Sequence, residues 1–276
     1  MSFLNLENKL ILIAGGGGGI GSIVAHILGQ CAARVAIADL NLENAKTITR
    51  EIAQTGTITA AYHLDVSSEQ STASIFETIS QDHGSVYGVV NCVGVVGPGE
   101  ALECDISEYQ RQIEINCYGA MRLARAFTNH IGQTSNAANE IPEEVRGSYV
   151  YISSIAADLA IPQRDPYCVS KAAGQAFHLN LANEVARLGI NVNVVLPGRT
   201  DTPSAAQRAR ESNDAARQMY ATQRRAAMIP ALTIAKTCAF LLSPDLLGYS
   251  GQKLVIAEGA DTTYRPSYEA LTRGDL

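Results

Sequence analysis

The chain has 276 residues, of which 46% are apolar and 17% charged, and its formal net charge is −6. This length suits one α/β domain with a large core, so we expect a single domain over residues 1–276. The acidic balance excludes the basic surface that binds nucleic acid. No apolar run reaches the roughly 18 residues of a membrane span and no signal peptide is recognisable, so we expect a cytoplasmic protein without a membrane partner.

The six cysteines and five histidines lack the spacing of metal ligands. Neither a CxxC pair nor an HExxH motif occurs, and we therefore predict no metal site. Most of the cysteines stand among apolar neighbours, as small buried thiols do. We interpret all six as structural: Cys31, Cys92, Cys104, Cys117, Cys168 and Cys238.

The first apolar run, Leu10–Ala14, ends at five consecutive glycines, Gly15 to Gly19. Such a run is typical of a strand buried on both faces of a parallel sheet, and the helical spacing from Ile20 to Leu28 predicts a helix behind the glycines. Glycine allows the backbone to approach a ligand closely, and a helix N-terminus attracts anions. The segment predicts a pyrophosphate site, with a solvated loop as the alternative.

A second apolar run, Arg34–Asp39, ends in an acid about 20 residues after the glycines, where dinucleotide-binding units carry a ribose ligand. Asp39 is thus predicted to accept hydrogen bonds from the adenosine ribose. A second role, as N-cap of the helix Leu42–Gln54, is compatible with the first.

Strands and helices alternate along the rest of the chain. The alternation predicts a single-domain, Rossmann-like α/β fold, with a doubly wound parallel sheet of about seven strands and helices on both faces. Ligands of such sheets bind beyond the carboxyl ends of the strands. The strands expected after the second are Thr57–Leu64, Val86–Asn91, Ser148–Ser153, Ile190–Leu196 and Lys253–Ala257.

A long helix is predicted from Ser107 to His130, with Gly119 near its middle. A helical glycine costs about 1 kcal/mol relative to alanine, so we expect a close contact there. The polar segment 132–146 is predicted to be a surface insertion before the next strand.

Asp165 and Pro166 predict the start of another helix, as its N-cap and first residue, and Gly189 predicts its end. Tyr167 and Lys171 then share one helical face, where the lysine cation favours the ionised phenol. A base near neutrality needs the phenol pKa lowered by about 3 units, on the order of 4 kcal/mol. A tyrosine beside a solvated lysine is the commoner meaning of such a pair taken alone.

The pair does not stand alone. Together with further motifs, the chain resembles the short-chain dehydrogenase/reductase family of the compact, non-extended type from about Leu6 to Ala260. The glycine spacing is similar to that of the family's cofactor loop. The run from Asn91 to Gly94 is similar to the family's strand-four motif. Pro197-Gly198 with Thr202 resembles the family's nicotinamide-side segment. Ala14, where the family usually has Thr, is a departure. The residues that match the family's catalytic tetrad are Asn116, Ser154, Tyr167 and Lys171.

The resemblance implies an oxidoreductase that interconverts a secondary alcohol and a ketone, its small-molecule substrate, by hydride transfer. Tyr167 would exchange the substrate proton and Ser154 would bind the substrate oxygen. Lys171 would bind the nicotinamide ribose, and Asn116 would complete a proton relay through water. The residues expected to bind the cofactor are Gly15, Gly18, Gly19, Ile20, Asp39, Leu40, Asp65, Val66, Asn91, Val93, Gly94, Tyr167, Lys171, Pro197, Gly198, Thr200 and Thr202.

The expected cofactor is NAD, because the carboxylate of Asp39 would repel a 2′-phosphate and neither Gly18 nor Leu40 offers a compensating cation. Two other functions remain open. One is a non-catalytic NAD(H)-binding regulator or scaffold, and the other is a ketoreductase acting on acyl chains.

The resemblance also implies a homotetramer in which the helices 107–130 and 166–188 pair across a two-fold axis. Small and apolar residues on both helices favour this, unless they simply cover the sheet: Ala120, Leu123, Ala124, Ala173, Ala176, Phe177 and Leu181. The arginine-rich stretch 202–229 has few core residues and is predicted to be a substrate lid, with two solvated helices as the alternative.

Overall fold

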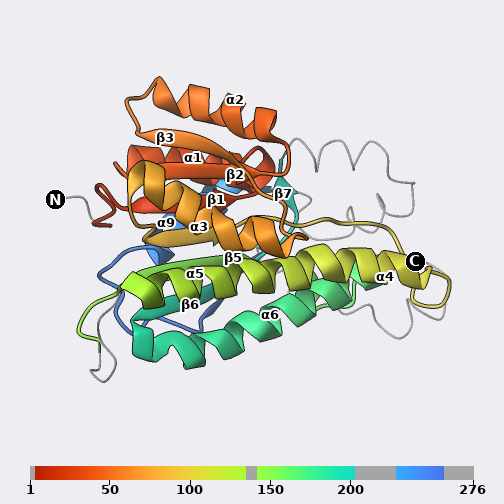
Figure 1. Cartoon of the computed structure of the whole chain (residues 1–276). Coiled ribbons are helices and arrows are strands. Elements are labelled where there is room, and N and C mark those ends of the chain that lie inside the picture. The colour runs from red at the N-terminus through yellow and green to blue at the C-terminus, as the bar shows by residue number, and fades with distance from the viewer. Residues whose placement is uncertain (1–3, 135–141, 203–227, 258–276) are drawn as a thin grey trace.

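The computed structural model describes residues 4–134, 142–202 and 228–257 (Figure 1). Seven strands form one parallel sheet in the order β3-β2-β1-β4-β5-β6-β9, which confirms the predicted Rossmann-like architecture. Short β7 and β8 pair separately. The strands are β1 Leu10–Ala14, β2 Arg34–Asp39, β3 Thr59–His63, β4 Gly88–Asn91, β5 Gly147–Ile152, β6 Ile190–Pro197, β7 Thr200–Asp201, β8 Ile229–Pro230 and β9 Lys253–Ile256.

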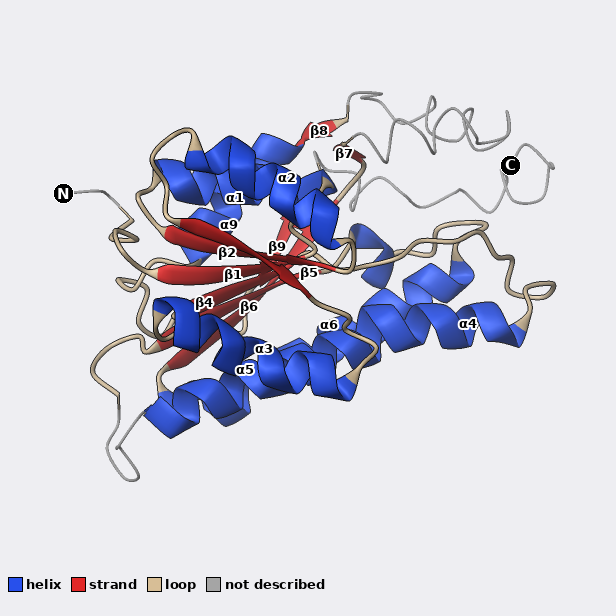
Figure 2. Cartoon of the chain, turned by 45° about the horizontal axis from the view of Figure 1, so that its top comes forward, coloured by secondary structure: helices blue, strands red, loops and turns tan. Residues whose placement is uncertain are grey.

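Helices cover both faces of the sheet. Figure 2 shows α1, α2 and α9 on one face, and α3, α5 and α6 on the other. Within the described residues, no helix is long and apolar enough to span a bilayer. The helices are α1 Gly19–Gln30, α2 Leu42–Ala53, α3 Glu69–His83, α4 Ile106–Ile113, α5 Ala120–Thr134, α6 Asp165–Val185 and α9 Ala231–Leu241.

The two faces hold two separate cores, and β1 contributes to both. Successive side chains of a strand point to opposite faces. Leu10 and Leu12 pack with α3, α5 and α6, whereas Ile11 and Ile13 pack with α1, α2 and α9. All five residues of β1 are buried, which explains why its sequence is apolar without alternation.

The helix predicted over 107–130 is present as a continuous helical segment from Ile106 to Thr134, but its middle is not α-helical. A π-helical stretch, Glu114–Gly119, separates α4 from α5. The close contact expected at Gly119 is confirmed, because a Cβ there would lie 2.7 Å from Cγ2 of Val66. Sequence propensity does not distinguish one wide turn from α-helix, and such turns are frequent at functional sites.

Two helix starts differ from the predicted ones. α6 begins with Asp165, so that this residue is not the N-cap, and its carboxylate instead accepts a hydrogen bond from the Tyr109 hydroxyl at 2.5 Å. α2 is capped by Asn41, whose side chain accepts from two backbone N–H groups, so the capping role weighed for Asp39 is also wrong. The left-handed Gly189 does follow the last turn, as predicted.

The predicted pairing faces separate into two sets. Ala120, Leu123, Ala124 and Leu181 are buried in the chain's own core, where they cover the sheet. Ala173 and Ala176 of the same set are exposed on α6. The homotetramer therefore stays a prediction that rests on the smaller, exposed set.

Two predicted segments fall largely outside the described residues, at 203–227 of the lid and 135–141 of the insertion. The ends of the lid segment are described. Thr200 pairs with Ile229 and Asp201 with Pro230, so the two described ends of this segment lie side by side.

Candidate active site

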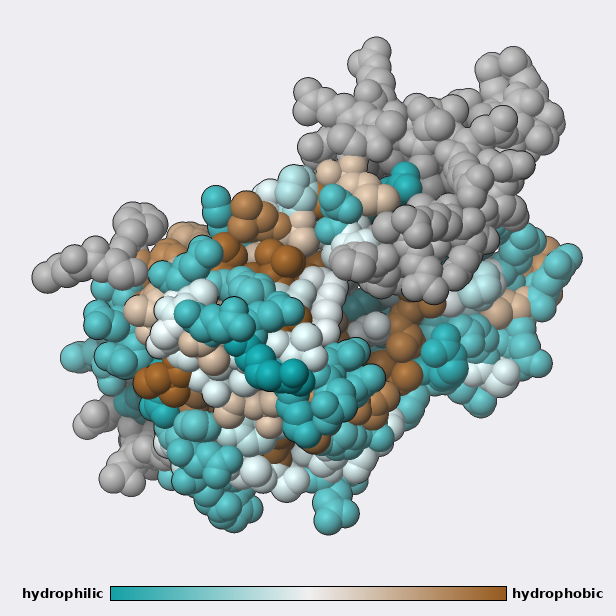
Figure 3. Space-filling view, turned by 90° about the horizontal axis from the view of Figure 1, so that it is seen from above, coloured by the Kyte–Doolittle hydropathy of each residue, from teal (hydrophilic) through white to brown (hydrophobic). Residues whose placement is uncertain are grey.

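The carboxyl ends of the strands meet at one edge of the molecule, where β7 and β8 also lie (Figure 2). β1 stands between β2 and β4, and its neighbours continue in opposite directions across the sheet. This is the switch point at which ligands of open α/β sheets bind. Viewed from above, apolar side chains gather near the middle of this face (Figure 3).

The glycine loop is crowded on its inner side and open on its outer side. Gly15 has a φ of 73° and lies against the backbone of Cys92 and Val93, where a Cβ would come within 3.0 Å. A Cβ at Gly21 would collide with the Gly15 carbonyl oxygen, whereas at Gly18 and Gly19 it would meet no atom within 4 Å. The inner glycines therefore close the turn, and the outer ones leave space above it.

This space suits a pyrophosphate. α1 starts at Gly19 with no capping side chain and no acid in its first turn, and Gly18 and Gly19 leave open space at this helix N-terminus. Oδ2 of Asp39 accepts a hydrogen bond from the Gly17 N–H at 2.9 Å, and its Oδ1 accepts from Asn41 N–H at 2.9 Å. The carboxylate is thus fixed beside the loop, and it has lone pairs left for ribose hydroxyls.

The segment after β3 contains two further residues that are predicted to bind the cofactor. Asp65 accepts from the hydroxyl and the N–H of Ser67, and these bonds lower the pKa of its carboxyl group. Val66 is buried against Gly119, and its carbonyl accepts a hydrogen bond from Arg122 at 3.3 Å. Arg122 also pairs with Glu114 at 2.6 Å, so the ion pair spans the π-helical stretch.

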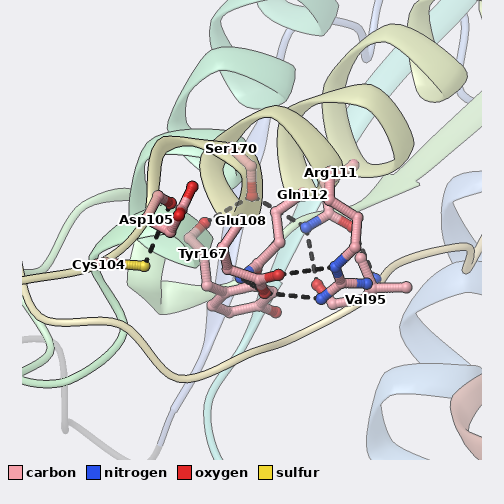
Figure 4. A network of polar contacts seen from close by, with 9 residues as sticks. Val95, Cys104, Asp105, Glu108, Arg111, Gln112, Tyr167 and Ser170 are labelled. Carbon is pink, nitrogen blue, oxygen red and sulfur yellow. Dashed lines mark hydrogen bonds and ion pairs between the residues drawn. The ribbon is translucent and has the colours of Figure 1, made fainter.

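Asn116 lies in that π-helical stretch and is fully buried. Its Oδ1 accepts from Val95 N–H, and its Nδ2 donates to the Val95 carbonyl, both at 2.8 Å. Nδ2 also donates to the Ser170 hydroxyl at 2.9 Å, which in turn donates to the Tyr167 carbonyl (Figure 4). One amide therefore joins the loop after β4 to α6.

Lys171 is the one lysine buried within the described residues, with 4% of its surface exposed. Its Nζ donates to the Ile152 carbonyl at 2.9 Å. Burial lowers the pKa of Lys171 to about 8, while the nearby Cys92 acts in the opposite direction. Gly94 makes room for it, because a Cβ there would lie 3.0 Å from Nζ and 3.2 Å from the Asn116 Oδ1.

Ser154 and Tyr167 lie on the solvent side of this buried pair. Ser154 follows β5 in an extended conformation, and its hydroxyl oxygen accepts from Ala156 N–H at 3.1 Å. Tyr167 is in the first turn of α6 and is partly exposed. Contacts join Asn116 to the Tyr167 backbone through Ser170, and Asn116 to Lys171 across Gly94, whereas Ser154 is placed by its position after β5, so the tetrad stays a prediction.

A family model described as "Enoyl-(Acyl carrier protein) reductase" matches residues 15–261. Short chain aldehyde dehydrogenase 1 of Euphorbia lathyris is 28% identical, over 96% of this chain and 92% of the relative. The chain belongs to the short-chain dehydrogenase/reductase family. Members of this family are oxidoreductases that typically use a nicotinamide cofactor.

Other members of this family are similar over different spans. The 7alpha-hydroxysteroid dehydrogenase of Escherichia coli K12 is 27% identical, over 93% of this chain and 95% of its own. Probable oxidoreductase EphD of Mycobacterium tuberculosis is 30% identical over 71% of this chain, and the match spans only about a third (31%) of EphD. A short-chain type dehydrogenase/reductase from Mycobacterium ulcerans has a similar fold, with a TM-score of 0.85, 24% identity, and coverage of 98% of this chain and 96% of its own.

The remaining residues that are predicted to bind the cofactor stay predictions, and several of them lie near the ends of β4 and β6. Asn91 Oδ1 accepts from Val93 N–H at 3.1 Å and holds the loop after β4. Pro197 ends β6, and the Thr200 hydroxyl donates to the Gly198 carbonyl at 3.0 Å. Three other predicted cofactor residues lie in or next to elements already described: Ile20 in α1, exposed Leu40 after β2, and buried Thr202 after β7.

The loop after β4 rests on a polar cluster of α4 that the sequence did not predict. Arg111 forms two hydrogen bonds to the carboxylate of Glu108, at 2.7 and 2.8 Å, and Gln112 Nε2 donates to the same carboxylate at 2.7 Å (Figure 4). A Cβ at Gly97 would collide with Glu108. The cluster therefore lies in close contact with the loop at Gly97.

The cysteines are unpaired in the structure. Burial raises the pKa of the Cys92 thiol to about 12, so it is protonated at neutral pH. The part of the chain that the structure describes contains no group of three or more His, Cys, Asp or Glu side chains that could hold a metal ion.

The sequence reasoning missed Tyr151 and Ser170, which contact the tetrad directly. Ser170 is buried and accepts from Asn116, and the Tyr151 hydroxyl donates to the Asn116 carbonyl. A signal was present, because β5 places two tyrosines on one face of a fully buried strand. A buried phenol needs a partner for its hydroxyl.

Proposed function

We propose that the chain is an NAD-dependent oxidoreductase that interconverts a secondary alcohol and a ketone, with Tyr167 as its general acid and base. The observation that carries the proposal is the buried Lys171, which lies against Gly94 beside Asn116, in a chain whose glycine loop leads into a helix without a capping side chain. A buried cation without a buried carboxylate partner is costly for the fold, and such groups are typical of functional sites.

The bound nicotinamide would supply or accept the hydride. Ser154 would donate its hydroxyl hydrogen to the substrate oxygen and hold the reacting carbon in place. Tyr167 would give its proton to that oxygen in reduction and take it back in oxidation. Lys171 would stabilise the phenolate electrostatically and bind the ribose, and its pKa of about 8 keeps it mostly charged at neutral pH.

Asp39 supports NAD as the preferred cofactor. Its carboxylate is fixed by Gly17 and Asn41 at the position where the ribose hydroxyls of the adenosine would lie. A 2′-phosphate at that position would face a like charge. We therefore expect kcat/KM with NADH to exceed that with NADPH by at least about tenfold, or about 1.4 kcal/mol.

The decisive experiment is turnover of a panel of secondary alcohols and ketones with NAD(H) and NADP(H), by the parent and by Tyr167→Phe. Loss of the phenol hydroxyl should lower kcat by about 10² to 10⁴ with little change in the Kd of NADH. Tyr249→Phe is the matched control, since Tyr249 packs against Phe240 away from the site and should keep full activity.

The panel also separates the other functions. An enoyl thioester and a 3-ketoacyl thioester are included, because the matching family model is named for an enoyl reductase. If only the thioesters are turned over, the substrate is an acyl chain, and the proposal of a secondary alcohol and a ketone is wrong. NADH binding with no turnover of any substrate would instead support the regulator or scaffold.

A further inference from the structure

The strongest unexplained group near the site is Tyr151, a fully buried tyrosine on β5. Its hydroxyl donates to the backbone carbonyl of Asn116 at 2.8 Å, across 35 residues of sequence. That carbonyl belongs to the π-helical stretch, where the ordinary α-helical pattern of hydrogen bonds is interrupted. The phenol thus holds the backbone of Asn116 from outside the helix.

The ring of Tyr151 also faces the second buried group of the site. Nζ of Lys171 lies 5.1 Å from the centre of this ring, within the range of a cation–π interaction. The adjacent residue of β5, Ile152, supplies the carbonyl that accepts from the same Nζ. Between them, two adjacent residues of β5, Tyr151 and Ile152, therefore contact both Lys171 and Asn116.

Two neighbours fix the phenol itself. The imidazole of His178 stacks on the Tyr151 ring, with centroids 4.1 Å apart and planes 5° from parallel. Gly174 provides the space for the hydroxyl, because a Cβ there would lie 2.5 Å from the Tyr151 oxygen and 3.0 Å from the Asn116 carbonyl oxygen. A glycine in the interior of a 21-residue helix costs about 1 kcal/mol, which this contact explains.

We propose that Tyr151 is a positioning residue, whose hydroxyl fixes the Asn116 backbone and whose ring fixes the ammonium group of Lys171. The inference rests on the proposed function, because it assigns to Tyr151 the placement of two groups of that site. It does not require Tyr151 to touch the substrate or the cofactor.

The test is Tyr151→Phe, which removes the hydroxyl and keeps the ring. The matched control is Tyr87→Phe, since Tyr87 is also buried and its hydroxyl also donates to a backbone carbonyl, that of Leu242 at 3.1 Å. We expect kcat to fall about tenfold and the Kd of NADH to rise about threefold in Tyr151→Phe only. Both variants should lose a similar amount of thermal stability.

The pH profile separates positioning from a merely structural role. A less well placed Lys171 would stabilise the Tyr167 phenolate less. The rising limb of the plot of kcat for alcohol oxidation against pH should therefore move to higher pH in Tyr151→Phe, and it should not move in Tyr87→Phe. Unchanged kcat, NADH affinity and pH limb in Tyr151→Phe would overturn the proposal.

A second variant protects the test against misfolding. Gly174→Ala, introduced into the parent protein, should lower kcat as Tyr151→Phe does, because the new methyl group displaces the Tyr151 hydroxyl. Introduced into Tyr151→Phe, the same substitution should lower kcat far less. Additive effects of the two substitutions would count against the inference. If the parent binds NADH but turns over no substrate, the proposed function fails, and the NADH affinities of the two tyrosine variants still decide the role of Tyr151.

Discussion

The two halves of the sheet's carboxyl edge are built in opposite ways. Beyond β1 and β2 the site consists of backbone and of space, with glycines whose inner side is packed and whose outer side is open. Beyond β4 and β5 it consists of buried polar side chains, among them Asn116, Ser170 and Lys171, each with specific partners.

This difference predicts opposite sensitivities to mutation. The first half should fail when atoms are added, because the turn has no room for them. The second half should fail in function when atoms are removed, although the fold gains from losing a buried charge.

Gly21→Ala adds one methyl group to the crowded side of the glycine loop. The new Cβ would collide with the Gly15 carbonyl, which is backbone and cannot turn away. We expect a loss of about 3 kcal/mol or more in the free energy of unfolding, measured with urea, together with loss of NADH binding.

Gly18→Ala is the counterpart on the open side of the same loop. Its Cβ would meet no atom within 4 Å, so stability should stay within about 0.5 kcal/mol while NADH affinity falls. Equal stability of Gly21→Ala and Gly18→Ala would contradict the division into a packed and an open side.

Lys171→Met removes the buried charge of the second half and keeps a side chain of similar shape. Burial has lowered the pKa of Lys171 from 10.5 to about 8, so removing the charge should stabilise the fold by about 1 to 3 kcal/mol at pH 7 while activity is lost. The unfolded chain binds more protons than the folded one between about pH 8 and 10.5, so parent stability gains there from this group.

The stability difference between Lys171→Met and the parent should accordingly shrink as the pH rises from 8 to 10. Urea unfolding of both proteins at pH 7 and pH 9.5 measures it. A variant that is less stable than the parent at pH 7 would show that the hydrogen bond to Ile152 outweighs the burial of the charge.

His178→Phe tests the layer behind the second half at acid pH. Burial lowers the pKa of His178 to about 4, and its Nε2 has no hydrogen-bond partner. Unfolding below pH 6.5 therefore takes up a proton, and this group costs the parent stability as the pH falls from 6.5 to 4. When the pH is lowered from 7 to 5, the free energy of unfolding of His178→Phe should therefore fall by about 1 to 2 kcal/mol less than that of the parent.

The comparison needs a histidine control. His26→Phe changes a partly exposed histidine of α1 and controls for the general effect of replacing histidine by phenylalanine. If His178→Phe follows the parent's acid unfolding curve, the imidazole of His178 is not held neutral by its surroundings.

The first half of the site could be predicted from the sequence, because its signals are local. Consecutive glycines between an apolar strand and a helix indicate the loop, and an acid at the end of the next strand indicates its partner. The pair Tyr167 and Lys171 could be predicted for the same reason, since four residues of one helix suffice to place it.

The second half depends on contacts between distant parts of the chain. Nothing in the residues around Tyr151 indicates that its hydroxyl meets Asn116, and nothing around Gly174 indicates what the missing side chain leaves room for. The π-helical stretch is also invisible to propensity, because it is set by tertiary packing such as that of Val66 on Gly119.

The sheet order has a consequence for biosynthesis. β1 is complete at residue 14, and its second neighbour, β4, starts only at Gly88. A nascent chain that has released only β1, β2 and β3 therefore carries a strand of five apolar residues with one edge unpaired, which is a template for aggregation. Substitutions that delay β4, such as proline at Val89, should reduce the yield of soluble protein during expression more than they reduce the activity of the molecules that reach the native state.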